Sequence, residues 1–394
     1  KAQHLANLLN AFAKLELREE QVALGKLATQ IPSRARDFQP IELSQALHAL
    51  VKLEMASEHR RSVMCLAEAI QEKGEDFHSR QLALSLHSFS MLNSSYNRLF
   101  ESLAPHVVST LGMADHQSAA LIFCAYARAG EVNGEVMQAL LETLQRSIAD
   151  AGEQMQVQLF YACGRFGLYK EPLTITLAEL LRENVLTLSG QHLANCLLAL
   201  SRLSLCNEQF SSLQAALQAR LLRRDVDLEP QHVANSLHAL AGIYGDGAPA
   251  QISHTPLPGP VVPRLIDFVV QSGSRWQQVP QLLASVAIDS AKLRQASPEL
   301  LTLVSQTVRQ EAIVKRGTQK LTKPIQSDLL WSFAVSGVFD LDFFSWALSQ
   351  LDTGSLASVP LDSLLTVLYS LDYVSFSGQI DQINQDRDDK TPGG

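Results

Sequence analysis

The stretch QHLANLLNAFAKLE, residues 3–16, occurs twice more in nearly the same form. QHLANCLLALSRLS spans residues 191–204, and QHVANSLHALAGIY spans residues 231–244. In each copy the apolar residues recur at spacings of three and four, which predicts a helix that is buried over most of its circumference. One helix copied at distant points of a chain indicates a repeat architecture.

The small residue near the start of this motif marks the same frame in other segments, and we call it the anchor. The anchors are Ala6, Ser44, Ala83, Ala120, Val157, Ala194, Ala234, Ala284, Ser327 and Leu365. Successive intervals are 38, 39, 37, 37, 37, 40, 50, 43 and 38 residues, and the motif is weaker at the last three anchors. A period this regular predicts about ten repeats.

The segments between anchors predict a second helix in each repeat. VNGEVMQALLETLQRSIADAG (132–152) and KEPLTITLAELLRENVLTLSG (170–190) both carry apolar residues at i, i+3, i+4 and i+7. A single helical hairpin cannot bury both of its faces, so neighbouring hairpins must stack. The sequence therefore predicts an all-α fold, an α-solenoid of about ten helix-turn-helix repeats of 37–40 residues.

Changes in periodicity and in Pro and Gly content divide the chain into four segments. Strongly periodic repeats cover residues 1–244, and the segment 245–263 is rich in Pro and Gly, which predicts an insertion loop. Degenerate helical repeats follow over 264–375. Residues 376–394 are polar and without periodicity, which predicts a disordered tail.

Composition narrows the classes of protein. The formal net charge is −8, so a strongly basic nucleic-acid binder is excluded. Five cysteines without a CxxC pair predict buried free thiols in a reducing compartment. No apolar run reaches the roughly 18 residues of a membrane span, so we expect no membrane partner.

Comparing the repeats by position shows a narrow polar stripe on the anchor helix. Offsets +1, +4 and +8 from the anchor fall on one arc of the helix, because each residue turns the helix by about 100°. Offset +1 carries mainly amides, offset +4 mainly flat rings, and offset +8 carries six cations and no acid. The candidate RNA-binding residues are Asn7, Asn10, Lys14, Gln45, His48, Lys52, His87, Arg128, Gln158, Tyr161, Arg165, Asn195, Arg202, Asn235, His238, Lys292 and Trp331.

Such a stripe is typical of proteins that bind single-stranded RNA. Cations contact phosphates, rings stack on bases, and amides pair with base edges. Each column also has a structural interpretation: the amides can bond neighbouring backbone, the histidines can be packed, and a cation near a helix C-terminus is favoured by the helix dipole. The coincidence of the columns on one arc favours RNA binding.

Other chemistries lack a sequence basis. His48, His87 and His238 belong to different repeats, and packed helices lie about 8–10 Å apart, too far for a shared metal. GxxxxGK[ST], GxSxG, GxGxxG and HExxH do not occur. We therefore expect no metal, no cofactor, no small-molecule substrate and no enzymatic activity.

The frame Q-x-L-A-N-x-L-x-A-L/F-A/S-K/R-L, with its period near 37, resembles the heptatricopeptide repeat and is similar to the octotricopeptide repeat. It also resembles the helical arrays that precede RAP domains in organellar RNA-binding proteins. The resemblance is strongest from Gln3 to about Ile243, and we identify no RAP domain between the last repeat and Gly394. It implies RNA binding in mitochondria or, alternatively, plastids, where membership of a mitochondrial ribosome is one possible setting.

The sequence thus predicts a non-enzymatic organellar RNA-binding protein. Its expected partners are single-stranded or ribosomal RNA and other proteins of a ribonucleoprotein complex. The alternative is a protein–protein scaffold in a large organellar complex, in which the polar stripe is a packing seam.

Overall fold

The computed structural model describes residues 2–92, 96–203, 207–245, 259–314, 321–350 and 365–372. Helices form all the regular secondary structure of these ranges, and no strand occurs within them. The predicted all-α class is therefore confirmed. Most of the predicted insertion loop (residues 246–258) and the whole predicted tail (376–394) lie outside the described residues.

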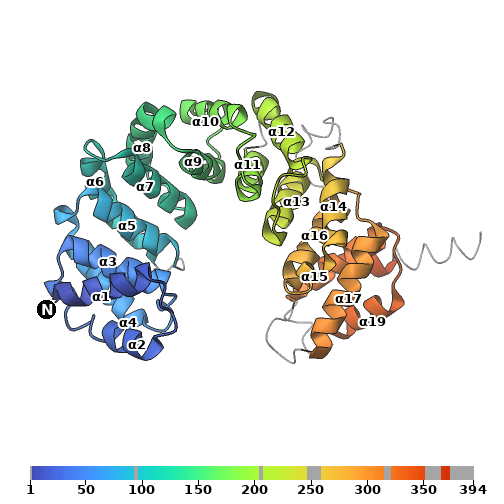
Figure 1. Ribbon diagram of the computed structural model, residues 1–394, viewed down its shortest axis with the longest axis horizontal. Helices are drawn as coiled ribbons and strands as arrows, with labels where there is room; N and C mark the ends of the chain where they lie inside the picture. The colour runs from blue at the N-terminus through green and yellow to red at the C-terminus, as the bar shows by residue number, and fades with distance from the viewer. Residues whose placement is uncertain are drawn as a thin grey trace, which may run out of the picture. The chain divides into compact units, whose positions relative to one another are not determined.

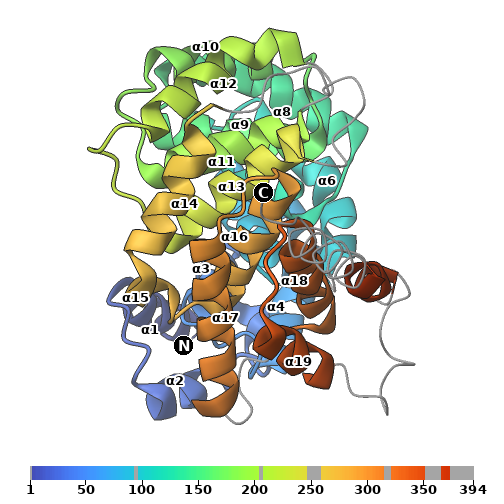
Figure 2. The same cartoon turned by 90° about the vertical axis from the view of Figure 1, so that its right-hand side faces the viewer.

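The chain forms two compact units, which we call unit 1 (residues 1–184) and unit 2 (residues 185–394). Each unit is a double layer of helices (Figures 1 and 2). We call the helices that carry the anchors the anchor layer, and the helices between them the second layer.

The anchor layer holds α1 (Ala2–Lys14), α3 (Pro40–Lys52), α5 (Ser79–Ser90), α7 (His116–Ala129) and α9 (Glu153–Phe166) in unit 1, and α11 (Gly190–Arg202), α13 (Pro230–Tyr244), α16 (Pro280–Lys292) and α18 (Lys323–Val335) in unit 2. Residues 365–372 form a further helical segment. The second layer holds α2 (Gln21–Ala28), α4 (Arg60–Glu72), α6 (Asn97–Leu111), α8 (Gly134–Ser147) and α10 (Pro172–Glu183) in unit 1, and α12 (Asn207–Leu221), α14 (Val261–Gln271), α17 (Pro298–Val314) and α19 (Leu341–Gln350) in unit 2. Short connecting helices are η1 (Ala35–Asp37), η2 (Gly74–Asp76), η4 (Ile148–Asp150) and α15 (Gly273–Trp276).

Each layer packs from one repeat to the next. In unit 1, α1, α3, α5, α7 and α9 contact one another in succession, and so do α4, α6, α8 and α10. In unit 2, α11, α13, α16 and α18 form one row, and α12, α14, α17 and α19 form the other. Each anchor helix also contacts the second-layer helix that follows it. This nearest-neighbour stacking is the packing of an α-solenoid, as predicted.

The predicted anchors occupy the tightest positions of this packing. Nine of the ten are buried, from Ala6 at 0 % exposed to Ala120 at 5 %. Small side chains there let neighbouring helices approach closely, because no bulky group separates the backbones. The tenth anchor, Leu365, differs from the others and is 54 % exposed.

Local sequence signals start the anchor helices. Asp115 accepts the main-chain N–H of Ser118 at 2.6 Å, and Ser189 accepts that of His192 at 3.3 Å. Proline occupies the first turn of α3, α13 and α16, where a missing N–H costs no helical hydrogen bond. These caps satisfy donors that the first turn leaves unpaired, so the repeat boundaries are encoded locally.

The anchor helices share a common ending ten residues after the anchor. Among the described residues, the one at this offset has a positive φ in six repeats. These residues are Glu16 (56°), Glu54 (61°), Gly130 (74°), Gly167 (68°), Arg294 (57°) and Gly337 (68°). This left-handed conformation ends a helix and turns the chain towards the second layer. Glycine adopts it without steric cost, whereas the three charged residues are strained there.

Candidate RNA-binding face

We define the polar stripe as the side chains at offsets +1, +4 and +8 on the anchor helices. Structure places these candidates on the surface, fully or in part. The exposed members are Asn7, Lys14, Arg128, Gln158, Arg165, Arg202 and His238. The half-buried members are Asn10, Gln45, His48, Lys52, His87, Tyr161, Asn195, Asn235, Lys292 and Trp331. The stripe has one segment in unit 1, up to Arg165, and one in unit 2, from Asn195.

Charge in unit 1 differs between the two layers. Its anchor helices hold five basic residues (Lys14, Lys52, Arg80, Arg128, Arg165) and two acids (Glu42, Glu153), a formal charge of +3. The second-layer helices α2, α4, α6, α8 and α10 hold six basic and seven acidic residues, a formal charge of −1. The anchor layer is therefore the side of unit 1 that attracts an anion.

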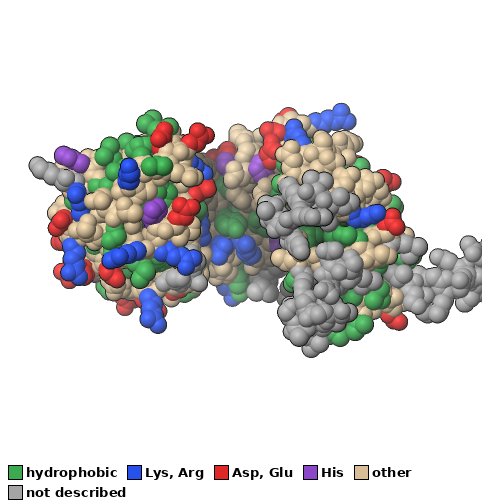
Figure 3. Space-filling view, turned by 90° about the horizontal axis from the view of Figure 1, so that it is seen from below, with side chains coloured by type: hydrophobic (Ala, Val, Ile, Leu, Met, Phe, Trp, Pro, Cys, Tyr) green, Lys and Arg blue, Asp and Glu red, His purple; other side chains and the backbone are tan. Residues whose placement is uncertain are grey.

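The described surface of unit 1 does not form one continuous basic patch that would attract an anion. On the face of unit 1 seen from below, basic, acidic and apolar side chains are interspersed (left part of Figure 3). An anionic ligand must therefore be held by individual side chains at short range.

In unit 1 the cations at offset +8 contact the end of the preceding anchor helix. Lys52 Nζ lies 3.3 Å from Glu16, just after α1. Arg128 Nη1 lies 3.2 Å from Ser90 Oγ, at the last residue of α5. Arg165 donates from Nε to the carbonyl of Ala127 at 2.8 Å and from Nη2 to that of Arg128 at 3.4 Å. The contacts of Arg165 satisfy main-chain carbonyls that a helix end leaves unpaired, whereas those of Lys52 and Arg128 go to side chains; all of them support a structural role for the cations at offset +8.

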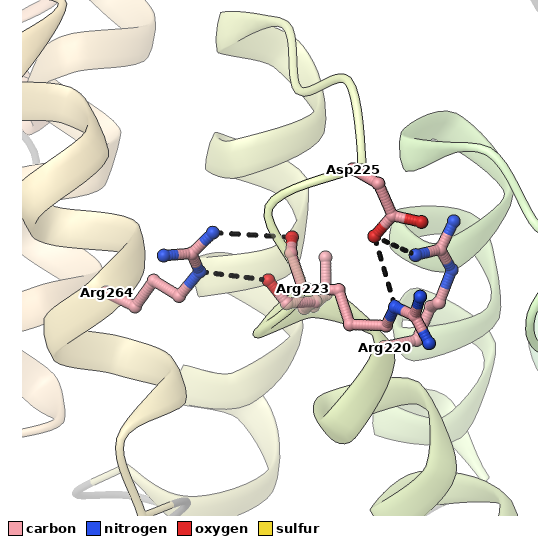
Figure 4. Close-up of polar contacts among 5 residues, drawn as sticks. Arg220, Arg223, Asp225 and Arg264 are labelled. Carbon is pink, nitrogen blue, oxygen red and sulfur yellow. Dashed lines mark hydrogen bonds and ion pairs between the residues drawn. The ribbon is translucent and has the colours of Figure 1, made fainter.

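The second layer of unit 2 has the same type of contact. Arg264 of α14 donates to the carbonyls of Leu221 and Arg223, at 3.4 and 3.3 Å, where α12 ends (Figure 4). Asp225 accepts from Arg220 at 2.8 Å and from Arg223 at 3.1 Å beside this contact. Arginine-capped helix ends are thus a device that repeats use in both layers.

The two histidines of the polar stripe in unit 1, His48 and His87, have lowered pKa values and are neutral at physiological pH. Burial, reinforced by the charge of Arg128 and by His48, lowers the pKa of His87 to about 4. Burial and the nearby Lys52 also lower the pKa of His48. His87 Nδ1 lies 3.4 Å from Arg128 Nη1, so the neutral ring accepts there and carries its proton on Nε2. A neutral imidazole with a free N–H suits contact with a base.

The stripe of unit 2 contains acids that pair with its cations. Asp289, at offset +5, is buried and lies 3.2 Å from His238 Nδ1 and 3.6 Å from Lys292 Nζ. The hydrogen bond to Asp289 raises the pKa of His238 against the opposing effect of burial. Burial raises the pKa of Asp328, which occupies offset +1 on α18. The prediction from offsets +1, +4 and +8 alone missed Asp289, which lies between +4 and +8.

The amides of offset +1 were open to a structural interpretation, in which they bond the neighbouring backbone. At Asn235, Oδ1 instead accepts from Nε2 of Gln231 in the same helix, at 2.8 Å. This i, i+4 pair stiffens one helix surface and leaves the amide group of Asn235 on the face of the stripe.

The described residues contain no group of three or more His, Cys, Asp or Glu arranged to hold a metal ion. Cys65, Cys124, Cys163 and Cys196 are free thiols. Burial raises the pKa of Cys163 to about 12, so its thiol is a packed apolar group rather than a nucleophile. None of the helices that the structure describes is both long and apolar enough to cross a bilayer.

Comparison with known families matches residues 1–244, which are 244 of the 394 residues, to the RNA-editing substrate-binding complex 6 protein. No curated protein matches the chain. The matched region contains all of the anchor layer of unit 1, together with α11 and α13 of unit 2. The chain belongs to the family of the RNA-editing substrate-binding complex 6 protein.

Proposed function

We propose that this protein is a non-enzymatic, RNA-binding subunit of an RNA-editing substrate-binding complex. The name of its family supports an RNA-associated assembly with several proteins. The anchor layer of unit 1 supplies the surface: cations at the helix ends, neutral rings and amides along the same arc. These groups are suited to the phosphates and bases of single-stranded RNA.

The observation that carries the proposal is the segregation of charge in unit 1. A protein of net charge −8 repels RNA as a whole, yet its five anchor helices there carry +3. Cations gathered on one layer of an acidic protein favour a defined anionic ligand over unspecific binding.

The setting we propose is the mitochondrion, because RNA-editing complexes are mitochondrial in kinetoplastids; a plastid has no such support. We also propose that the repeats are of the heptatricopeptide type, on the resemblance of their frame. A mitochondrial ribosome and its ribosomal RNA stay the alternative setting for the same surface.

Direct RNA binding is tested with the purified chain and a fluorescent single-stranded RNA of mixed sequence. We expect binding at low salt that weakens linearly with log salt, at a slope of about −0.7 per phosphate contacted. A duplex RNA of the same sequence should bind less well, because its bases are hidden from the rings. Binding no stronger than that of an acidic control protein of similar size would contradict the proposal.

A scaffold function is the second candidate, and one observation favours it. The contacts of Lys52, Arg128 and Arg165 with the preceding helix ends give the cationic column a structural role without any RNA. If that is the only role, removing these cations lowers the unfolding temperature, and the chain shows no RNA affinity at any salt concentration.

A further inference from the structure

The cations of the polar stripe differ in what they contact. Lys52 pairs with the carboxylate of Glu16, and Lys292 lies beside that of Asp289. The hydrogen bonds of Arg128 and Arg165, both in the described part of unit 1, go to neutral acceptors. These two arginines therefore keep their charge for a ligand, whereas a phosphate at Lys52 or Lys292 must compete with a carboxylate.

Both guanidinium groups are held in place and still have donors to offer. A guanidinium has five N–H donors. Arg128 uses only Nη1, and Arg165 uses Nε and Nη2. Arg128 thus retains Nε and Nη2, and Arg165 retains Nη1. A cation already ordered by the protein loses less conformational entropy when it binds an anion.

The two arginines belong to consecutive repeats and are directly connected. Arg165 on α9 donates to the carbonyl of Arg128 itself, at the C-terminal end of α7. Neighbouring helices pack about 8–10 Å apart, a spacing that helical repeats use to bind one nucleotide each. The half-buried ring of His87 contacts Arg128 from the preceding helix, α5, through its Nδ1.

The geometry points to a phosphate clamp: Arg128 and Arg165 bind two successive phosphates of a single-stranded RNA, and His87 contacts a base beside Arg128. The clamp rests on the proposed function and narrows it to the α5–α7–α9 segment of unit 1. In unit 2, Asp289 lies beside both His238 and Lys292, so a phosphate at either of these residues must compete with a carboxylate.

The test compares the purified wild-type chain with two double variants that carry the same charge change. One variant is Arg128→Gln with Arg165→Gln. Its control is Arg146→Gln with Arg182→Gln, two exposed arginines on the second-layer helices α8 and α10. The probe is a 12-nucleotide single-stranded RNA, and its dissociation constant is measured at several salt concentrations.

The clamp predicts that the first variant binds at least about tenfold more weakly and that its salt slope is flatter by about 1.4, two phosphate contacts. The control should bind as the wild type does. A third variant, Arg128→Lys with Arg165→Lys, keeps both charges, so it should retain the slope and lose affinity only in part, because the planar donor fork is absent.

The outcomes separate the clamp from the proposed function. If the wild-type chain does not bind the RNA, the proposed function fails and the clamp with it. If the wild type binds and both double Gln variants lose affinity equally, only net charge matters and the clamp is overturned. The clamp is also overturned if Lys292→Gln weakens binding more than the double variant Arg128→Gln with Arg165→Gln does.

Discussion

The side chain of Arg165 donates a 2.8 Å hydrogen bond from Nε to the main-chain carbonyl of Ala127, one repeat earlier. This contact joins the ends of α7 and α9 independently of the apolar core between them. A side chain in a candidate binding surface thus also holds two repeats together. Stability and ligand affinity must be measured on the same variants if the two roles are to be separated.

Arg165→Gln should lower the free energy of unfolding by about 1 kcal/mol, because the carbonyls of Ala127 and Arg128 lose a charged donor. Urea denaturation followed by far-UV circular dichroism measures the change. Arg182→Gln on α10, which is also exposed and makes no such contact, serves as the control. Equal stability of the two variants would show that the end-to-end contact contributes nothing.

Gly130→Ala should destabilise the protein by about 1 kcal/mol. Gly130 ends α7 with φ of 74°, where a side chain is strained although the surrounding space is open. Gly134→Ala, four residues further on in α8, meets no neighbour within 4 Å and removes a flexible residue from a helix. It should stabilise by about 0.4–1 kcal/mol. Thermal unfolding of the pair checks both signs.

His87 should make the protein less stable as the pH falls from about 6.5 to 4. In the folded state its pKa is about 4 through burial, Arg128 and His48, against 6.5 as the usual value. Within this window the unfolded chain binds a proton that the folded chain does not, so acid favours unfolding. Denaturation of the wild type and of His87→Asn at pH 7 and pH 5 gives the comparison.

The His87→Asn variant should lose less stability between the two pH values than the wild type. Nuclear magnetic resonance of the histidine ring protons provides a direct check. A His87 resonance that titrates near 6.5 would contradict the assignment of a neutral, buried ring.

Asp289→Asn should return the pKa of His238 towards lower values, because the hydrogen bond to this carboxylate is the main cause of its elevation. Because its pKa is raised, the protonated His238 stabilises the folded state at acid pH, and this contribution is lost as the pH rises through that pKa. The variant should therefore lose stability chiefly below about pH 6.5. The ring protons of His238 report the titration. An unchanged His238 pKa would show that the pair is not formed in solution.

The fold could be predicted from the sequence because the same buried pattern recurs in each repeat. Ala6, Ala194 and Ala284 are small and occupy the same position of the repeat, and they are fully or almost fully buried. The sequence period therefore marks positions where neighbouring helices pack. Leu365 occupies the same position of the frame and is 54 % exposed. Periodicity alone therefore does not show how deeply a given position is buried.

The candidate site could be predicted only in part. Offsets on a helix wheel place Arg128 and Arg165 on one arc, but they do not show which groups of the neighbouring repeat these side chains contact. The carbonyls of Ala127 and Arg128 are main-chain atoms and leave no mark in the sequence. Asp289 can be read from the sequence, but the sequence does not show that this buried carboxylate pairs with His238 and Lys292.

Under the proposed function, the opposite formal charges of the two layers of unit 1 set a limit on the length of RNA that unit 1 binds. An oligonucleotide gains attraction only while its phosphates lie along the five anchor helices. Any nucleotide that extends beyond them meets the field of a chain with net charge −8 and gains nothing further. Affinity should therefore rise with RNA length and then level off once the anchor layer of unit 1 is filled.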